Sequence, residues 1–284
     1  MKIDCTADNW RMMILPMQAW PQRFVAWITA FTQKGAHANN HAPVSRCMPL
    51  HRARYWAIIP LTHMVYVPIN KVSASLEPHV PALWIDRVTP LVAEGIHLYV
   101  LVFFIGGLAT VTIMDLGMVK RVVMACALMQ LFAFACFLIF PVHMVSRPQS
   151  VTISSLSTWG LGLCYWIDAP SNCFPSLHVA LPTLATLSIG RISRTRGTVS
   201  GLLTLGVAVS TMLIKQHFFV DVVAGAFLGI VTYLLFVARY PMKKAVFQHT
   251  VPRNYPGMLI AVYGVAYFVL ITAYQLGWAP WAPM

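Results

Sequence analysis

The chain has 284 residues, of which 58% are hydrophobic and only 10% are charged. Soluble domains carry about 25% charged residues, so this composition excludes an ordinary soluble globular protein and indicates an integral membrane protein. Twenty Lys and Arg stand against eight Asp and Glu. In a membrane protein this excess is typical of cytoplasmic loops and of contact with anionic headgroups, and we expect no nucleic-acid partner.

Residues 1–50 form an N-terminal extension that does not share the pattern of the rest of the chain. Its apolar stretch is interrupted by Pro16, Pro21 and Arg23, and it lacks the compact hydrophobic region and the cleavage site of a signal peptide. An interfacial helix, a disordered tail and a misassigned start all stay open for this part. We expect residues 51–284 to form one membrane-embedded domain.

The apolar runs after residue 50 predict an all-α fold, a polytopic helical bundle of six to seven membrane spans. A span needs about 20 apolar residues. The first run is the weakest because it contains two prolines, and two later runs are short and must pack against neighbouring helices. Gly225 and Gly229 form a GxxxG motif, which predicts close helix packing. The predicted spans are residues 54–71, 95–114, 122–142, 174–190, 197–214, 218–238 and 256–276.

The Lys and Arg residues of the loops predict the orientation of the bundle. With the region before the first span placed inside, eleven loop cations fall on the inner side and four on the outer side. The N-terminus is therefore expected in the cytoplasm and the C-terminus outside. The same orientation places the 143–173 loop, the start of FPSLH (174–178) and the 215–217 join on the outer face, where their polar groups converge.

The segment KQHFFVD, residues 215–221, carries a candidate catalytic pair. His217 and Asp221 are four residues apart at the start of a predicted helix, so their side chains are expected on one helix face. The carboxylate can accept the Nδ1 proton of the imidazole and leave Nε2 free to attack. A buried pair that only satisfies itself is the structural alternative, but a carboxylate inside an apolar span is costly and favours function.

The stretch FPSLH, residues 174–178, predicts a phosphate site at the mouth of a span. Pro175 suits the first turn of a helix, and the free amides of that turn, together with the helix dipole, favour an anion. Ser176 adds a hydroxyl donor, and His178 lies one turn inside, where a protonated ring can donate to a departing oxygen. A proline-started helix with a structural histidine is the alternative.

The cysteines show no CxxC and no zinc-ligand spacing. Cys126 and Cys136 lie inside an apolar run and are interpreted as small hydrophobic residues. Cys164 and Cys173 flank one outer loop, so a disulfide between them is open, although nothing in the sequence requires it.

PSLH followed about forty residues later by HxxxD resembles the type 2 phosphatidic acid phosphatase superfamily, and Arg147 with the proline after it resembles the first motif of that family. NCFPSLHVA, WIDAPSN and WIDRVTPLV resemble one branch, the inositol phosphorylceramide synthase-like proteins. The resemblance covers roughly residues 80–240 and implies a six-helix core. It implies that His217 is the nucleophile, His178 the general acid and Asp221 the residue behind the nucleophile.

Two positions depart from the family pattern. The family's first motif has a Lys seven residues before its Arg, where this chain has Phe140, and its third motif has Ser-Arg where this chain has Ser210–Thr211. The phosphate site therefore has fewer fixed cations, and we expect the side chains that bind the substrate phosphate to be Arg147, Ser176 and Lys215. The departures disfavour simple monoester hydrolysis more than phosphoryl transfer in general.

Together these features predict an integral-membrane lipid phosphatase or phosphotransferase that acts on phospholipid or isoprenoid phosphate esters through a phosphohistidine, with water or an alcohol headgroup as acceptor. We expect no cofactor and no metal, because the sequence offers no acidic cluster to hold one. The expected partners are the lipid phosphate substrate and membrane lipids. We expect the plasma (inner) membrane, with the active site on the outer, periplasmic face. A transporter or a catalytically inactive lipid-binding relative is the alternative.

Overall fold

The computed structural model describes residues 49–241 and 255–282, which lie within one compact unit, Arg46–Met284. Regular secondary structure in the described ranges is helical, and the pairing of His79 with Val142 is an isolated bridge. The predicted all-α fold class is therefore confirmed. The predicted extension, residues 1–50, lies almost entirely outside the described residues, so its nature and the domain boundary stay predictions.

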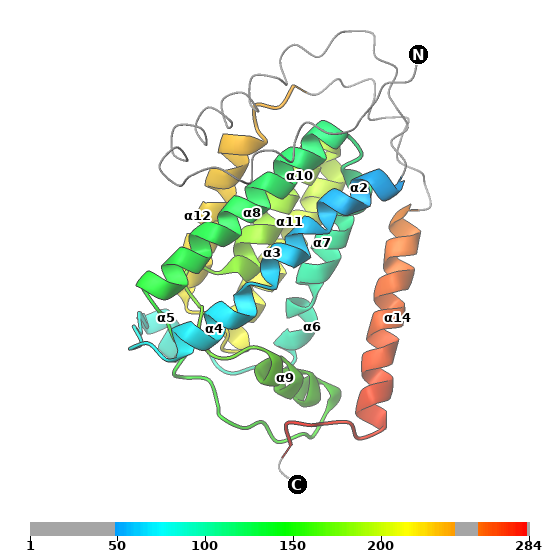
Figure 1. Cartoon of the computed structure of the whole chain (residues 1–284). Coiled ribbons are helices and arrows are strands. Elements are labelled where there is room, and N and C mark those ends of the chain that lie inside the picture. The colour runs from blue at the N-terminus through cyan, green and yellow to red at the C-terminus, as the bar shows by residue number, and fades with distance from the viewer. Residues whose placement is uncertain (1–48, 242–254, 283–284) are drawn as a thin grey trace, which may run out of the picture. The chain divides into compact units, whose positions relative to one another are not determined.

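Five stretches of the described chain are long and apolar enough to cross a membrane, and a sixth apolar helix is shorter, with 16 residues. They correspond to the last six predicted spans. The helices, labelled in Figure 1, are α2 (Pro49–Trp56), α3 (Ile58–His63), α4 (Tyr66–Ala74), α5 (Trp84–Val88), α6 (Gly95–Tyr99), α7 (Leu101–Thr112), α8 (Leu116–Ile139), α9 (Leu156–Ile167), α10 (Leu177–Ile192), α11 (Arg194–Leu213), α12 (Phe219–Phe236) and α14 (Tyr255–Gln275).

The first predicted span is broken into the three short helices α2, α3 and α4, which pack along α8. Its two prolines explain the breaks, because a proline has no N–H to bond the carbonyl four residues before it. Pro60 would have to bond Trp56, where α2 ends, and Pro68 would have to bond Met64, which caps α3. This part of the chain is helical but is not one continuous span.

The short helix α10 lies in the middle of the bundle, packed against α7, α8, α11 and α12. Small residues allow the close approach: a Cβ on Gly229 would lie 2.6 Å from the carbonyl oxygen of Ala180, and a Cβ on Gly225 would overlap the carbonyl oxygen of Ser176. The interpretation of this GxxxG motif as a packing motif is confirmed. The predicted dependence of the short 174–190 run on its neighbours is confirmed as well.

Arg191 and the candidate catalytic residues lie at opposite ends of the helices. At one end, Arg191 donates to the carbonyl oxygens of Val237, Ala238 and Tyr240, which extend from the C-terminus of α12. At the other end, main-chain hydrogen bonds join the loops: Met144 to Pro170, Cys173 to Val142 and Val92 to Leu213. The predicted polar segments, which are the 143–173 loop, the start of FPSLH and the 215–217 join, therefore gather at one end of the bundle. The membrane face to which this end belongs stays a prediction.

Candidate active site

The loop between α11 and α12 holds His217. The amides of Gln216 and His217 both donate to the carbonyl oxygen of Thr211, at 2.8 and 3.2 Å, and Lys215 has a positive φ of 53°. Helix α12 begins only at Phe219, so His217 precedes the helix and does not share a helix face with Asp221. The expected i, i+4 arrangement is wrong in this respect.

His217 and Asp221 nevertheless lie together, because Asp221 caps the start of α12. Its Oδ2 accepts a hydrogen bond of 2.8 Å from the amide of Phe218, and the same oxygen lies 3.6 Å from Nδ1 of His217. This is an ion-pair distance and not a hydrogen bond. The carboxylate is fully buried and thus faces the imidazole without competing water.

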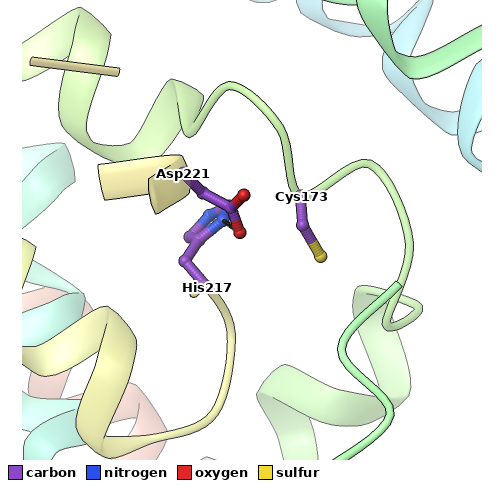
Figure 2. A group of neighbouring side chains, drawn as sticks. All are labelled: Cys173, His217 and Asp221. Carbon is purple, nitrogen blue, oxygen red and sulfur yellow. Dashed lines mark ion pairs between the residues drawn. The ribbon is translucent and has the colours of Figure 1, made fainter. Parts of the chain in front are cut away.

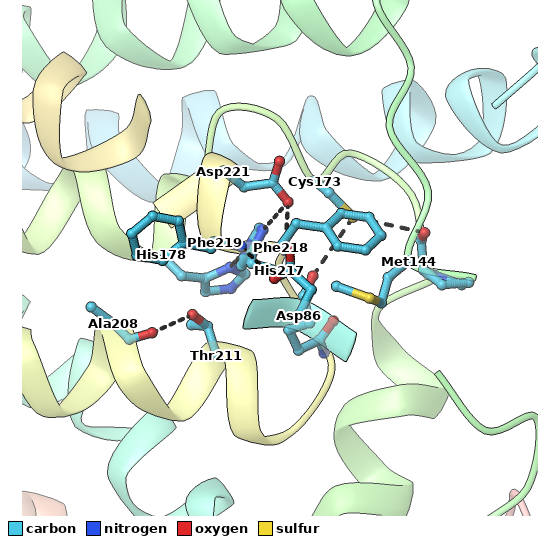
Figure 3. Close-up of polar contacts among 12 residues, drawn as sticks. Asp86, Met144, Cys173, His178, Ala208, Thr211, His217, Phe218, Phe219 and Asp221 are labelled. Carbon is cyan, nitrogen blue, oxygen red and sulfur yellow. Dashed lines mark hydrogen bonds and ion pairs between the residues drawn. The ribbon is translucent and has the colours of Figure 1, made fainter. Parts of the chain in front are cut away.

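His178 enters from the start of α10, and Figure 3 shows it beside His217. Ser176 is the N-cap of α10, so Pro175 lies before the cap and not in the first helical turn as expected. The amide of Ser176 donates to the carbonyl oxygen of Asp221 at 3.1 Å, which ties the starts of α10 and α12 together. Nδ1 of His178 lies 3.0 Å from Nε2 of His217, and the ring centroids are 5.3 Å apart.

Tyr99, at the end of α6, extends this row of side chains. Its hydroxyl lies 2.7 Å from Nε2 of His178. One set of tautomers fits all the contacts: Tyr99 donates to His178, His178 donates from Nδ1 to His217, and the Nδ1 proton of His217 points to Asp221. Sequence reasoning missed Tyr99, because the only signal was a hydroxyl near one end of an apolar span.

Several buried polar atoms at the site have no hydrogen-bond partner among the residues that the structure describes. They are Oγ of Ser176, Nδ1 of His217 and Oδ1 of Asp221. Buried polar groups are usually paired, and exceptions are common where a ligand binds. Ser176 is fully buried, and its hydroxyl has no partner among the described residues.

The two predicted phosphate-binding cations are engaged with protein oxygens. Arg147 donates to the carbonyl oxygens of Tyr165 and Asp168, both at 2.6 Å, and to Oε1 of Gln216 at 3.2 Å. These bonds use three of the five N–H donors of a guanidinium. Lys215 donates to the carbonyl oxygens of Asp86 and Thr89. No described contact brings either cation to the two imidazoles.

The segment WIDRVTPLV braces the loop that carries His217. The main-chain carbonyl oxygens of Asp86 and Thr89 accept hydrogen bonds from Nζ of Lys215. In addition, Oδ1 of the Asp86 side chain accepts a hydrogen bond of 2.7 Å from the amide of Phe219 (Figure 3). The positions that depart from the family pattern supply no substitute cation. Phe140 packs against the rings of His79 and Phe174, and the hydroxyls of Ser210 and Thr211 donate to carbonyl oxygens of their own helix.

Cys173 lies beside His217 and Asp221, the candidate catalytic pair, as Figure 2 shows. A ligand atom from each of Cys173, His217 and Asp221 lies within 4.8 Å of the others, so this group could hold a metal ion. Metal binding there would take up the imidazole nitrogen and the carboxylate that the pair needs for orientation. Cys164 and Cys173 are both free thiols, so the disulfide left open by the sequence is not formed.

A cavity of about 760 Å³ opens beside His178 and Tyr99. Apolar side chains of α6, α7, α9 and α14 make up most of its wall. Pockets of this size hold ligands as large as a lipid headgroup with part of its chains. The polar side chains on the wall near α4 and the end of α9 are His63, Tyr66, Asn70, Lys71 and Asp168.

A comparison with protein-family models matches residues 83–235 to a family described as the PAP2 superfamily. The matched range contains α5 to α12 up to its last turn, and with it both imidazoles and the carboxylate. Neither the curated proteins nor the solved structures give a match.

Proposed function

Because the chain belongs to the PAP2 superfamily, we propose that it is an integral-membrane phosphatase or phosphotransferase that moves the phosphoryl group of a lipid phosphate ester through a phosphohistidine. Family membership suggests the membrane phosphatase or phosphotransferase class. The observation that carries the mechanism is the contact of 3.0 Å between His178 and His217, with Asp221 behind His217.

In the first step, the lone pair on Nε2 of His217 attacks phosphorus and the bond from phosphorus to the leaving oxygen breaks. Protonated His178 gives its Nδ1 proton to that oxygen. Asp221 stabilises the positive charge that develops on His217. After His178 has given up its Nδ1 proton, the neutral ring still carries the proton on Nε2, so the Tyr99 hydroxyl accepts from Nε2 and holds the ring both before and after the transfer.

In the second step, water or an alcohol attacks the phosphohistidine, and the bond from phosphorus to nitrogen breaks. His178 takes the proton of the attacking hydroxyl, and His217 regains its lone pair. Water yields hydrolysis, whereas an alcohol yields transfer. The phosphate must enter between the imidazoles, because His178 occupies the attacking nitrogen of His217 in this structure.

Three groups are assigned to the phosphate oxygens. The hydroxyl of Ser176 is buried and has no described partner. Arg147 has two N–H donors that its three described hydrogen bonds do not use. Lys215 has one N–H donor that its two described hydrogen bonds do not use. Charge-assisted hydrogen bonds from such groups stabilise a transferring phosphoryl group. The mechanism needs no metal ion in any step.

The inositol phosphorylceramide synthase-like branch, with an alcohol as acceptor, is our assignment within the superfamily. The segments that resemble this branch lie at the site: Asp86 braces the His217 loop, and Asp168 lies on the cavity wall. The excess of eleven predicted inner-side cations over four on the outer side supports an outer-face active site and a cytoplasmic N-terminus, although Lys120 and Arg121 among the eleven lie inside α8. The plasma membrane as location is our assignment.

The test is to incubate the purified protein with phospholipids labelled in the phosphate and a mixture of alcohols, and to identify the labelled products. The wild type should release labelled phosphate or a labelled ester, and His217→Ala should abolish both. His79→Ala is the matched control, because His79 is an exposed histidine outside the site. Wild-type rates in His217→Ala would refute the mechanism, and a wild type that moves no label would favour a transporter or an inactive relative.

A further inference from the structure

Asp168 has a carboxylate oxygen without a protein donor. It caps the end of α9 and lies on the cavity wall. Its Oδ1 accepts a hydrogen bond of 2.7 Å from the hydroxyl of Tyr66, which in turn accepts one of 3.4 Å from Asn70. No donor among the described residues bonds Oδ2. Arg147 donates to the main-chain carbonyl of Asp168 and not to its carboxylate.

The surroundings leave this oxygen open to a donor in the cavity, because Asp168 is only partly buried and lies on the cavity wall. Burial raises the pKa of Asp168, and the Tyr66 hydrogen bond and the charge of Arg147 oppose that rise. A partly buried carboxylate oxygen is paired either by water or by a donor of a bound ligand. Tyr66 also fixes the rotamer of the carboxylate, and a preorganised acceptor facing a cavity is suited to bind a ligand donor.

The free oxygen shares its cavity with the catalytic groups. His178 and Tyr99 line the same cavity as Asp168. A molecule whose reacting hydroxyl lies at His178 therefore has Asp168 within the same binding space.

The charges around the cavity favour a hydroxyl over an ammonium as the ligand donor. Lys71 also lines the cavity, and Arg147 lies behind Asp168. These two cations repel a further positive charge that enters the cavity. A neutral hydroxyl can donate to Oδ2 without this repulsion.

We propose that Asp168 binds a second hydroxyl of the acceptor alcohol, while the first hydroxyl reacts at His178, so that the enzyme prefers acceptors with at least two hydroxyl groups. The inference rests on the proposed phosphotransferase function and adds its acceptor specificity. The apolar wall lets the acceptor carry a hydrocarbon chain, so both a lipid diol and a water-soluble polyol have the required chemistry.

The test compares three acceptors with the same labelled donor phospholipids: octanol, the octanediol with hydroxyls on its first two carbons, and glycerol. For the wild type, kcat/KM for the diol should exceed that for octanol about tenfold or more, as expected for one hydrogen bond to a charged group. The ratio should fall in Asp168→Asn and fall close to one in Asp168→Ala. A higher kcat/KM for the diol than for glycerol identifies a lipid acceptor, and the reverse identifies a soluble polyol.

Two further variants separate specificity from folding. Tyr66→Phe removes the hydroxyl that orients Asp168, so it should lower the same ratio by a smaller factor. Glu77→Gln removes an exposed carboxylate outside the cavity and should keep the wild-type ratio. Because each ratio is measured within one variant, a partly folded sample does not change it.

The outcomes distinguish this inference from the proposed function. If the wild type forms phosphohistidine and transfers to all three alcohols but Asp168→Ala keeps the wild-type ratio, the acceptor site is refuted and the function stands. If the wild type transfers to the diol no faster than to octanol, the acceptor site is likewise refuted and the proposed function stands. If the wild type never cleaves the donor, both the function and the acceptor site are refuted.

Discussion

The hydroxyl of Tyr99 lies 2.7 Å from Nε2 of His178, at the end of the imidazole that faces away from His217. The two rings are also in contact, with centroids 4.9 Å apart. Tyr99 is almost fully buried, so this hydrogen bond does not compete with bulk water. His178 is thereby held at both nitrogens, and its orientation toward a substrate depends on Tyr99.

Tyr99→Phe should lower kcat about tenfold and leave KM nearly unchanged. It removes one hydrogen bond, worth about 1 kcal/mol or more, from the ring that transfers the proton, and it removes no group assigned to phosphate binding. Steady-state kinetics on the labelled donor lipid would measure both constants. Tyr263→Phe is the control, because the Tyr263 hydroxyl has no described hydrogen-bond partner. A rise in KM with kcat unchanged would show that Tyr99 binds substrate and does not position His178.

Asp221→Asn should slow turnover less than His217→Ala does. The Asn side-chain oxygen can still accept from the amide of Phe218, so the start of α12 is kept, while the charge 3.6 Å from His217 is lost. We expect a loss of about tenfold to a hundredfold, since the change affects orientation and charge but not the attacking atom. Single-turnover trapping of the phosphohistidine would measure it. A loss as large as that of His217→Ala would assign Asp221 a different role.

Gly225→Ala should destabilise the protein by about 1–3 kcal/mol, because the new methyl group would overlap the carbonyl oxygen of Ser176. Relief of this overlap moves the start of α10 and with it His178, so activity should fall together with stability. Thermal unfolding in detergent measures the first effect. Gly264→Ala is the matched control in α14, where a methyl group meets no atom within 4 Å. Equal melting temperatures for both variants would contradict the packing seen here.

The rate of alkylation of Cys164 should be low at neutral pH. It should keep increasing with pH beyond the range in which an ordinary thiol ionises. Burial, followed by the charge of Asp168, raises the pKa of Cys164 to about 11. Only the thiolate reacts, so a raised pKa lowers the reactive fraction at every pH below it. Mass spectrometry of iodoacetamide labelling up to about pH 10 measures the rate, and the detergent-unfolded chain provides the reference. A plateau in the folded protein near the ordinary thiol pKa would contradict this environment.

Hydrophobicity alone predicted most of the helices, because a membrane span requires an apolar run of fixed length. Two expectations are wrong: the predicted 143–173 loop contains the helix α9 (Leu156–Ile167), and α8 begins at Leu116 and not at residue 122. The charges of Lys120 and Arg121 predict a loop at these positions. Both lie inside the helix, with their cationic ends over the rings of Tyr55 and Tyr240. The apolar stem of a Lys or Arg side chain can lie along the helix surface while its charged end reaches a more polar partner. A charged residue alone therefore does not mark the end of a helix.

The sequence predicts that His178, His217 and Asp221 lie at one end of the bundle. The prediction follows from the order of the motifs along the chain and from the opposite directions in which successive spans cross the membrane. Only the tertiary structure decided that Tyr99 bonds His178, that Asp168 faces the cavity, and that Arg147 and Lys215 bind main-chain carbonyls. These contacts join residues far apart in sequence. Hydrophobic periodicity determines which segments are helical, whereas the packing of one helix against another determines which side chains meet.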